Sequence, residues 1–184
     1  YTLNTYRGSG GMSVLAVSNN WLNILPPTQA AGMSTGGIRI EDARIYTEGS
    51  FALALRGAGA LTIDPAMRYG ARELSLSVPA INLGESAALA AAARDNVLPA
   101  GLEFDQVLLN RLLAGNDEPG VPALESLRLG ARESINVFGT VNLDTIDPAT
   151  GQPRLKTLVL NTPAIYGRGG AGDTATLSAS RLVW

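Results

Sequence analysis

The sequence predicts an all-β fold, a parallel β-solenoid interrupted by a short helical insertion around residues 85–115. Three observations favour this class. Short runs of alternating apolar residues recur along most of the 184-residue chain. Turn-forming residues separate these runs, since the chain has 21 Gly and 10 Pro with only 5% aromatic residues. Several runs also resemble one another, which is typical of stacked repeats.

The apolar runs predict nine strands. An alternation of apolar and polar residues places one set of side chains on a buried face and the other set on the opposite face. Clusters of Gly, Pro, Asn and Asp stand between the runs and predict turns. The expected strands are residues 12–17, 38–40, 51–55, 61–63, 74–78, 127–129, 135–143, 158–160 and 177–184.

An imperfect internal repeat links several of these strands. Residues 70–83 (GARELSLSVPAINL) resemble residues 130–143 (GARESINVFGTVNL) at an offset of 60 (130 − 70). Residues 74–81 (LSLSVPAI) resemble residues 158–165 (LVLNTPAI) at an offset of 84 (158 − 74). A weaker copy at 38–45 comes 36 residues earlier (74 − 38). Such copies favour a stack of similar units over a sandwich or a barrel, because each unit buries its face only against its neighbours.

One region departs from the alternation and predicts two helices. Residues 85–95 carry a block of Ala and Leu, with Ser86 as the expected N-cap. The second helix is expected over residues 105–115, with Asp105 as N-cap and Gly115 as C-cap. Its expected apolar stripe consists of Val107, Leu108, Leu109 and Leu112.

These elements are expected to form one continuous domain in three parts. Residues 1–84 and 124–184 form solenoid coils, and residues 85–123 form the helical insertion with its return loop. We expect the chain to be a fragment of a larger protein, since it begins at Tyr1 without an initiator Met. An exposed end of such a fragment is an open sheet edge, which predicts self-association.

The composition excludes several classes of function. The chain has no Cys and no His, so it has no Cys/His zinc site, disulfide, thiol nucleophile or imidazole-based triad. The net charge of −2 comes from 14 basic and 16 acidic residues that are well mixed, so no nucleic-acid partner is expected. No segment reaches the roughly 20 apolar residues of a membrane helix, so no membrane insertion is expected.

Recurring phrases carry a family resemblance over residues 38–184. The phrases are ARIYTEGSFALAL at 43–55, the stretches 61–86 and 107–115, and LESLRLGARESINVFGTVNLD at 124–144 with LKTLVLNTPAIYG at 155–167. In these phrases the chain resembles the fibre region of the filamentous haemagglutinin family, exoproteins of Gram-negative bacteria secreted by a dedicated partner barrel (two-partner secretion). The family's amino-terminal secretion domain is not evident in the sequence.

The resemblance implies a right-handed parallel β-helix outside the cell. It implies secretion through an outer-membrane transporter partner and a place in the secreted fraction or on the outer cell surface. It also implies a cell-surface glycan or protein as receptor, on host or bacterial cells. The fibre region of the family contributes no catalytic residues that this chain would inherit.

The stretch 167–172 reads GRGGAG and matches the pattern G-x-G-x-x-G of dinucleotide-binding loops. Such a loop needs a helix directly after it, whose N-terminus meets the phosphates. Residues 173–184 alternate instead and predict a strand. The glycines are therefore predicted to be a lengthened version of the corner that ends at Gly84.

Two pairs of carboxylates and one acidic glycine motif are the other candidate sites. Glu41 and Asp42 are adjacent, so on a strand they point to opposite faces. Asp144 and Asp147 flank a turn. A glycosidase needs two carboxylates across one sugar bond, and solvated turn residues are the favoured interpretation. The stretch 169–173 (GGAGD) is one incomplete copy of a calcium-binding repeat. We therefore predict no catalytic, cofactor-binding or metal-binding residue.

Two repeated polar residues are expected to have structural roles. Arg72 and Arg132 occupy the same place in the two GARE phrases. Stacked arginines would form a basic ladder for acidic glycans, but an exposed Arg–Glu pair at a turn is favoured. Asn82 and Asn142 occupy the same place in INL and VNL. We expect them at matching turns, with stacked, inward-facing side chains.

The sequence thus predicts a non-enzymatic segment of a large bacterial exoprotein that serves adhesion or presents loops or a terminal domain. Two other classes remain open. One is a β-helical polysaccharide-degrading enzyme that uses Asp144 and Asp147. The other is a self-assembling filament or sheath subunit.

Overall fold

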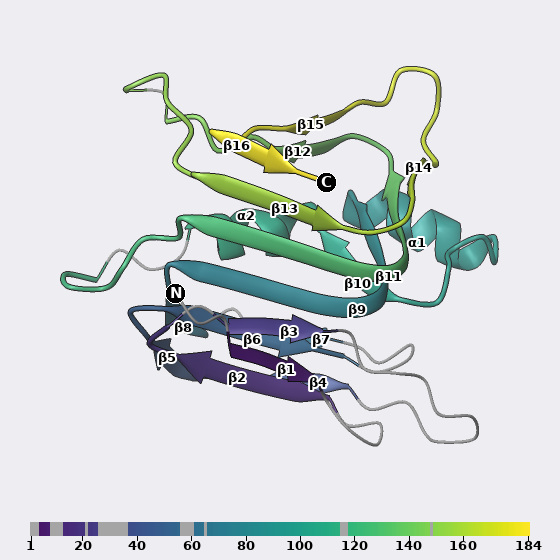
Figure 1. Cartoon of the computed structure of the whole chain (residues 1–184). Helices are drawn as coiled ribbons and strands as arrows, with labels where there is room; N and C mark the ends of the chain where they lie inside the picture. The colour runs from purple at the N-terminus through teal and green to yellow at the C-terminus, as the bar shows by residue number, and fades with distance from the viewer. Residues whose placement is uncertain are drawn as a thin grey trace.

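The computed structural model describes residues 4–7, 13–20, 22–25, 37–55, 61–64, 66–114, 118–147 and 149–184. This part of the chain is mostly β with two helices, as expected (Figure 1). The helices are α1 (Ser86–Arg94) and α2 (Gln106–Ala114). The strands are β1 (Asn4–Arg7), β2 (Val14–Ser18), β3 (Leu22–Leu25), β4 (Ile38–Ile40), β5 (Arg44–Tyr46), β6 (Ser50–Ala54), β7 (Leu61–Ile63), β8 (Arg68–Gly70), β9 (Glu73–Gly84), β10 (Leu102–Asp105), β11 (Ser126–Phe138), β12 (Val141–Leu143), β13 (Thr157–Asn161), β14 (Ile165–Gly167), β15 (Ala175–Leu177) and β16 (Arg181–Val183).

One large mixed sheet contains eight of the described strands. Its order is β16-β13-β11-β9-β6-β2, with β10 beside β9 and β14 beside β11. All of its pairs are parallel except β2 with β6, which is antiparallel. Figure 1 shows its long strands β9, β11 and β13 lying side by side in this sheet. Further parallel pairs are β1–β3, β4–β7, β5–β8 and β12–β15.

The register of the sheet confirms one of the sequence repeats. Leu74 pairs with Leu127 and Leu127 pairs with Leu158, so residues 84 apart (158 − 74) occupy equivalent positions two strands apart. The later part of the phrase keeps this register, since Ile81 pairs with Ile135 and Ile135 with Ile165.

The other two repeats do not follow the register. Gly130 pairs with Ser77 and not with Gly70, its counterpart in the sequence repeat. The 60-residue offset is therefore wrong as a structural repeat. Ile38 lies on β4 and pairs with Leu61, outside the main sheet, so the 36-residue offset is wrong as well. In each of these two repeats the matching residues do not pair with one another. The reason is that strand register follows which side chains become buried, and a few identical residues do not fix it.

Alternating apolar residues fill the inner face of the main sheet. Each column runs through successive strands at one register position, as Phe51, Leu74, Leu127 and Leu158 do. These side chains are no more than 1% exposed. A second column contains Leu53, Leu76, Leu129 and Leu160. Burying each such side chain contributes about 1.5–3 kcal/mol, so the two columns are a main source of stability.

The opposite face of the same strands is small and polar. Leu22 of β3 and Ala16 of β2 pack against Ala52 and Ala54 there. Further along this face Glu73, Ser75 and Ser77 are buried, and the hydroxyls of both serines have no hydrogen-bond partner among the described residues.

The helical insertion agrees in part with the sequence. Asp105 is the N-cap of α2, since its Oδ1 accepts a hydrogen bond from the Leu108 amide at 2.7 Å. The N-cap of α1 is Glu85, and Ser86 is its first helical residue. Val107 is 69% exposed, so its place in the apolar stripe is wrong; Leu109 and Leu112 are the buried residues of α2. The expected C-cap, Gly115, lies outside the described residues.

Several strands differ from their expected extent. Residues 135–143 do not form one strand, because Gly139 adopts a φ of 72° between β11 and β12, a conformation that glycine tolerates. Residues 177–184 contain the end of β15 and all of β16. The short strands β1, β3, β5, β8, β10 and β14 were not expected.

Both edges of the main sheet expose apolar side chains. At the β2 edge, Leu15 and Val17 are each 47% exposed. At the β16 edge, Leu182 is 57% and Trp184 is 75% exposed. Leu15 pairs with Leu53, and Leu182 with Leu158, so these residues extend the buried columns beyond the last covered strand.

Candidate functional site

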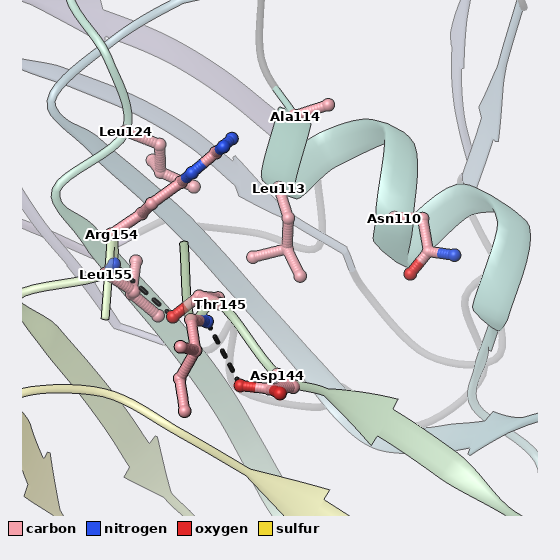
Figure 2. Close-up of a pocket in the computed structure, with 9 residues that line it drawn as sticks. Asn110, Leu113, Ala114, Leu124, Asp144, Thr145, Arg154 and Leu155 are labelled. Atoms are coloured by element: carbon pink, nitrogen blue, oxygen red, sulfur yellow. Dashed lines mark hydrogen bonds between the residues drawn. The ribbon is translucent and has the colours of Figure 1, made fainter. Parts of the chain in front are cut away.

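A groove with an apolar floor and charged ends lies beside α2 (Figure 2). Its volume is about 330 Å³. We call it the α2 groove; it is lined by Asn110, Leu113, Ala114, Leu124, Asp144, Thr145, Ile146, Arg154 and Leu155. One wall is therefore helical, and the opposite wall comes from the loop between β12 and β13.

Three hydrogen bonds fix α2 as a wall of the groove. The Gln106 side chain donates to the carbonyl of Asn142 at 2.6 Å and accepts from the amide of Asn142 at 2.8 Å. At the other end of the helix, the buried hydroxyl of Tyr69 donates to the carbonyl of Leu112. Burial raises the pKa of Tyr69, so the hydroxyl remains a donor.

Asp144 is the negative end of the groove. Its Oδ1 accepts hydrogen bonds from the Ser178 hydroxyl at 2.5 Å and from the Ile146 amide at 3.0 Å. These bonds, the one from Ser178 first, lower the pKa of Asp144, so its carboxylate is ionised at neutral pH. Oδ2 has no hydrogen bond to a described residue.

Arg154 is the positive end of the groove. Its Nε lies 3.7 Å from Oδ2 of Asp147, and its side chain is 69% exposed. Asp147 itself shapes the loop, since its Oδ1 accepts from the Ala149 amide at 2.8 Å. The two aspartates do not flank one turn, because Ile146 between them bridges to Pro153 and the turn at residues 149–150 comes after Asp147. Each aspartate accepts a hydrogen bond from the backbone amide two residues further on.

The glycine-rich stretch is a turn between strands. β14 ends at Gly167 and the next element is the strand β15, so no helix N-terminus is present to bind phosphates. Asp173 closes the turn by accepting a hydrogen bond from the Gly170 amide at 2.6 Å. Within the described residues, no group of three or more carboxylates lies close enough to hold a metal ion.

The pair Glu41 and Asp42 is exposed. Glu41 pairs with Arg39 at 3.0 Å, and both side chains are about three-quarters in solvent. The structure brings neither residue to the α2 groove.

The two GARE arginines lie in different environments. Arg72 belongs to a column of alternating charges, with Glu48 at 3.1 Å and Glu125 at 3.0 Å. Lys156 extends the column by contacting Glu125 at 3.1 Å. Arg132 pairs with its neighbour Glu133 at 3.0 Å, at the point where the β9–β11 register shifts. The arginines are therefore not stacked. Arg72 forms its Arg–Glu pairs at a bend, as favoured, whereas Arg132 lies within β11 and not at a turn.

An asparagine stack exists, but it lies on strands β9 and β11 and not at turns, and Asn82 has a different partner from the one expected. Asn82 is fully buried and receives a hydrogen bond from Asn136 at 3.0 Å. Asn142 is exposed, so its predicted place in the stack is wrong. The column continues at both ends: Asn82 donates to the Pro99 carbonyl at 2.7 Å, and Arg168 donates to Asn136 at 3.2 Å.

Sequence reasoning did not find the α2 groove. Asn110 and Arg154 stand alone in the sequence, more than forty residues apart (154 − 110), with no motif around them. Only Asp144 was singled out. The local signal that was present is the polar Asn110 one helical turn before the apolar Leu113 and Ala114 in 110-NRLLA-114.

Comparison of the chain with protein-family models, with curated proteins and with solved structures finds no match. Neither helix in the described part of the chain has the length and apolar character that crossing a bilayer requires.

Proposed function

We propose that this chain is a segment of a right-handed parallel β-solenoid in a large secreted or surface-attached bacterial exoprotein, where it serves adhesion or presentation. The observation that carries the proposal is the repeated parallel register. β4–β5–β6 and β7–β8–β9 run side by side, with partners 23 or 24 residues apart (61 − 38, 68 − 44). Equal spacing at three successive strands is what consecutive coils of a solenoid produce.

The corner that leads into the main sheet repeats in the same way. The amides of Arg72 and Glu73 donate to the Gly49 carbonyl, and those of Glu125 and Ser126 to the Arg72 carbonyl. Lys156 and Thr157 then donate to the carbonyl of Glu125. The same corner thus occurs before each of the strands β9, β11 and β13. A corner that recurs in this way supports a chain that winds through one similar coil after another.

The inserted segments are the parts of such a fibre that meet partners. The two helices and the loop between β12 and β13 lengthen individual coils, and α2 and that loop supply most of the residues that line the α2 groove. Surface loops on a rigid scaffold are where binding residues concentrate. Adhesion through these loops, with a cell-surface glycan or protein as receptor and an outer-membrane transporter for export, is the function that we propose.

The solenoid can be tested by crosslinking, because the chain has no Cys and every introduced thiol is unique. Arg72→Cys with Glu125→Cys places two thiols at stacked corners and is expected to form a disulfide rapidly under mild oxidation. The matched control, Arg72→Cys with Arg132→Cys, follows the 60-residue sequence repeat and is expected to remain reduced. An experimental structure with left-handed coils would contradict the proposed handedness.

Adhesion is tested with fluorescent beads that carry the purified chain. We expect them to bind cultured epithelial cells or bacterial cells more than beads that carry an unrelated β-protein of similar charge. Equal retention of both bead types on every surface would contradict the adhesive role.

The alternative of a polysaccharide-degrading enzyme has less support. A glycosidase needs one carboxyl group that stays protonated to act as an acid, and the hydrogen bonds to Asp144 lower its pKa instead. Release of reducing ends from uronate or neutral glycans, lost in Asp144→Asn and Asp147→Asn, would establish the enzyme.

A further inference from the structure

The α2 groove offers unused hydrogen-bonding groups on both sides of an apolar floor. The only ion-pair contact of Arg154 within the described residues is the long one from its Nε to Asp147, so its terminal guanidinium nitrogens are available. Across the floor, Oδ2 of Asp144 is available in the same way, and Asn110 has two amide hydrogens without a partner among the described residues. Figure 2 shows Arg154 and Asp144 on opposite sides of Leu113.

The floor between the charges is aliphatic. Leu124 and Leu155 are buried at its base, and Leu113 reaches into it from the helix. Ile146 is 46% exposed at the rim, which makes it the largest solvent-facing apolar side chain among the lining residues. No aromatic ring lines the groove, so it lacks the flat apolar platform on which sugar rings stack.

We infer that the α2 groove binds a short peptide segment of a partner protein in which an aliphatic side chain lies between a basic residue and an acidic residue. The acidic residue pairs with the guanidinium of Arg154, whose planar fork matches a carboxylate. The basic residue pairs with Asp144, and the aliphatic side chain covers Leu113 and Ile146.

Charge complementarity selects this occupant over two others. A purely anionic ligand, such as a uronate chain, meets the repulsion of Asp144, which is ionised throughout the neutral range. A purely aliphatic ligand leaves both charges without a partner and removes water from them, which is unfavourable. The inference deepens the adhesive role proposed above and rests on it, since it names the receptor class as a protein.

The test is a titration of the folded chain with the peptide Ac-Lys-Leu-Leu-Glu-NH2. Binding is measured by calorimetry or by changes in the NMR chemical shifts of the protein. We expect a dissociation constant of about 0.1–1 mM, the range of a small exposed site. Replacing the peptide's Glu by Gln, or its two Leu by Gly, is expected to weaken binding about tenfold in each case. These peptide variants leave the protein unchanged, so the result does not depend on a variant's folding.

Protein variants then assign the ends of the site. Arg154→Gln is expected to abolish the preference for the Glu peptide over the Gln peptide, and Asp144→Asn the preference for Lys over its uncharged analogue. The matched controls are Arg39→Gln and Asp42→Asn, which change the same residue types outside the groove and are expected to bind like the parent chain.

Three outcomes would overturn the inference. The first is no binding of the peptide at about 5 mM, five times the upper end of the expected range of dissociation constants. The second is peptide binding that is unchanged in Arg154→Gln. The third is tighter binding of a galacturonate trimer than of the peptide. Beads that adhere to cells in spite of any of these results would leave the adhesive role intact, because adhesion would then use another surface.

Discussion

Asn136 donates a hydrogen bond from its Nδ2 to Oδ1 of Asn82 at 3.0 Å, across 54 residues of sequence. Both side chains are fully buried, so every hydrogen bond that their amides make comes from within the protein: Asn82 also donates to the Pro99 carbonyl, and Asn136 also accepts from Arg168. The bond joins β9 to β11 at Asn82↔Asn136, just where the register settles again after the shift between Ala131 and Ser134. A polar ladder at this place favours one register, because a one-residue slip of β11 against β9 would break the hydrogen bond between the two buried amides.

Asn136→Ala is expected to destabilise the fold by about 1–3 kcal/mol, since it leaves the Asn82 carbonyl unsatisfied in the interior. Chemical denaturation measures the loss. Asn142→Ala is the matched control, because Asn142 is exposed, and its change is expected to stay within about 0.5 kcal/mol. Equal losses in the two variants would contradict a stabilising role for the buried ladder.

Glu73→Gln is expected to stabilise the chain at neutral pH. Burial raises the pKa of Glu73, although Arg128 and Ser50 act in the opposite direction. The folded state therefore holds the proton more tightly than the unfolded state, and stability falls as the pH rises from about 4 through the raised pKa. The glutamine avoids this cost, so we expect a higher melting temperature than that of the parent chain at pH 7 and no gain below about pH 4.

Thermal unfolding of Glu73→Gln and the parent chain over this pH range checks the sign. Glu41→Gln, an exposed acid that also pairs with an arginine, is the control and is expected to show no such gain. A lower melting temperature for Glu73→Gln at pH 7 would show that the contact with Arg128 outweighs burial.

Tyr69→Phe is expected to loosen α2. The lost hydroxyl leaves the carbonyl of Leu112 without a partner near the end of the helix, at a cost of about 1 kcal/mol. Hydrogen exchange is expected to rise over Gln106–Ala114 more than elsewhere. Tyr166→Phe is the control, since Tyr166 is exposed and its ring contact with Arg168 does not need the hydroxyl.

Gly84→Ala is expected to destabilise the junction between β9 and α1 by about 1–3 kcal/mol. A Cβ at this position would lie 2.6 Å from the carbonyl oxygen of Phe138 and 3.1 Å from Leu89. Gly167→Ala is the control, because a Cβ there meets nothing within 4 Å. If both substitutions are neutral in urea denaturation, the close approach of α1 to β11 at Gly84 is not required.

The sequence predicted the strands of the main sheet well where apolar alternation is strong. The Leu-x-Leu triplets at residues 74–76, 127–129 and 158–160 lie on β9, β11 and β13, and Leu74 and Leu158 occupy equivalent positions, as the 84-residue repeat predicted. It predicted the short strands β4 and β7 from their Ile-x-Ile and Leu-x-Ile patterns but missed β1, β3, β5, β8, β10 and β14, because three or four residues often carry too little pattern to distinguish a strand from a turn. The helix cap at Asp105 was predictable from local chemistry, and Val107 was not placed correctly because a stripe on a helix does not say which side faces the sheet.

The candidate site shows the same division. Asp144 was singled out because it stands beside a turn signal, which is local information. Arg154 and Asn110 lie on segments far from each other in the sequence, and only the folding of the chain brings them beside Asp144. No spacing along the sequence therefore marks them.

By itself, the sequence determined the class of the fold, the main strands, the turn at residues 167–172 and the absence of Cys and His chemistry. These follow from side-chain periodicity, backbone preferences and composition, which act over a few residues. Tertiary structure alone decided that Asn82 pairs with Asn136 and not with Asn142, and that Arg72 and Arg132 do not stack. It also decided that α2 forms a groove with the loop after β12. Those choices depend on the lengths of the intervening segments and on which faces become buried, because pairing across a sheet is set by the whole register and not by local resemblance.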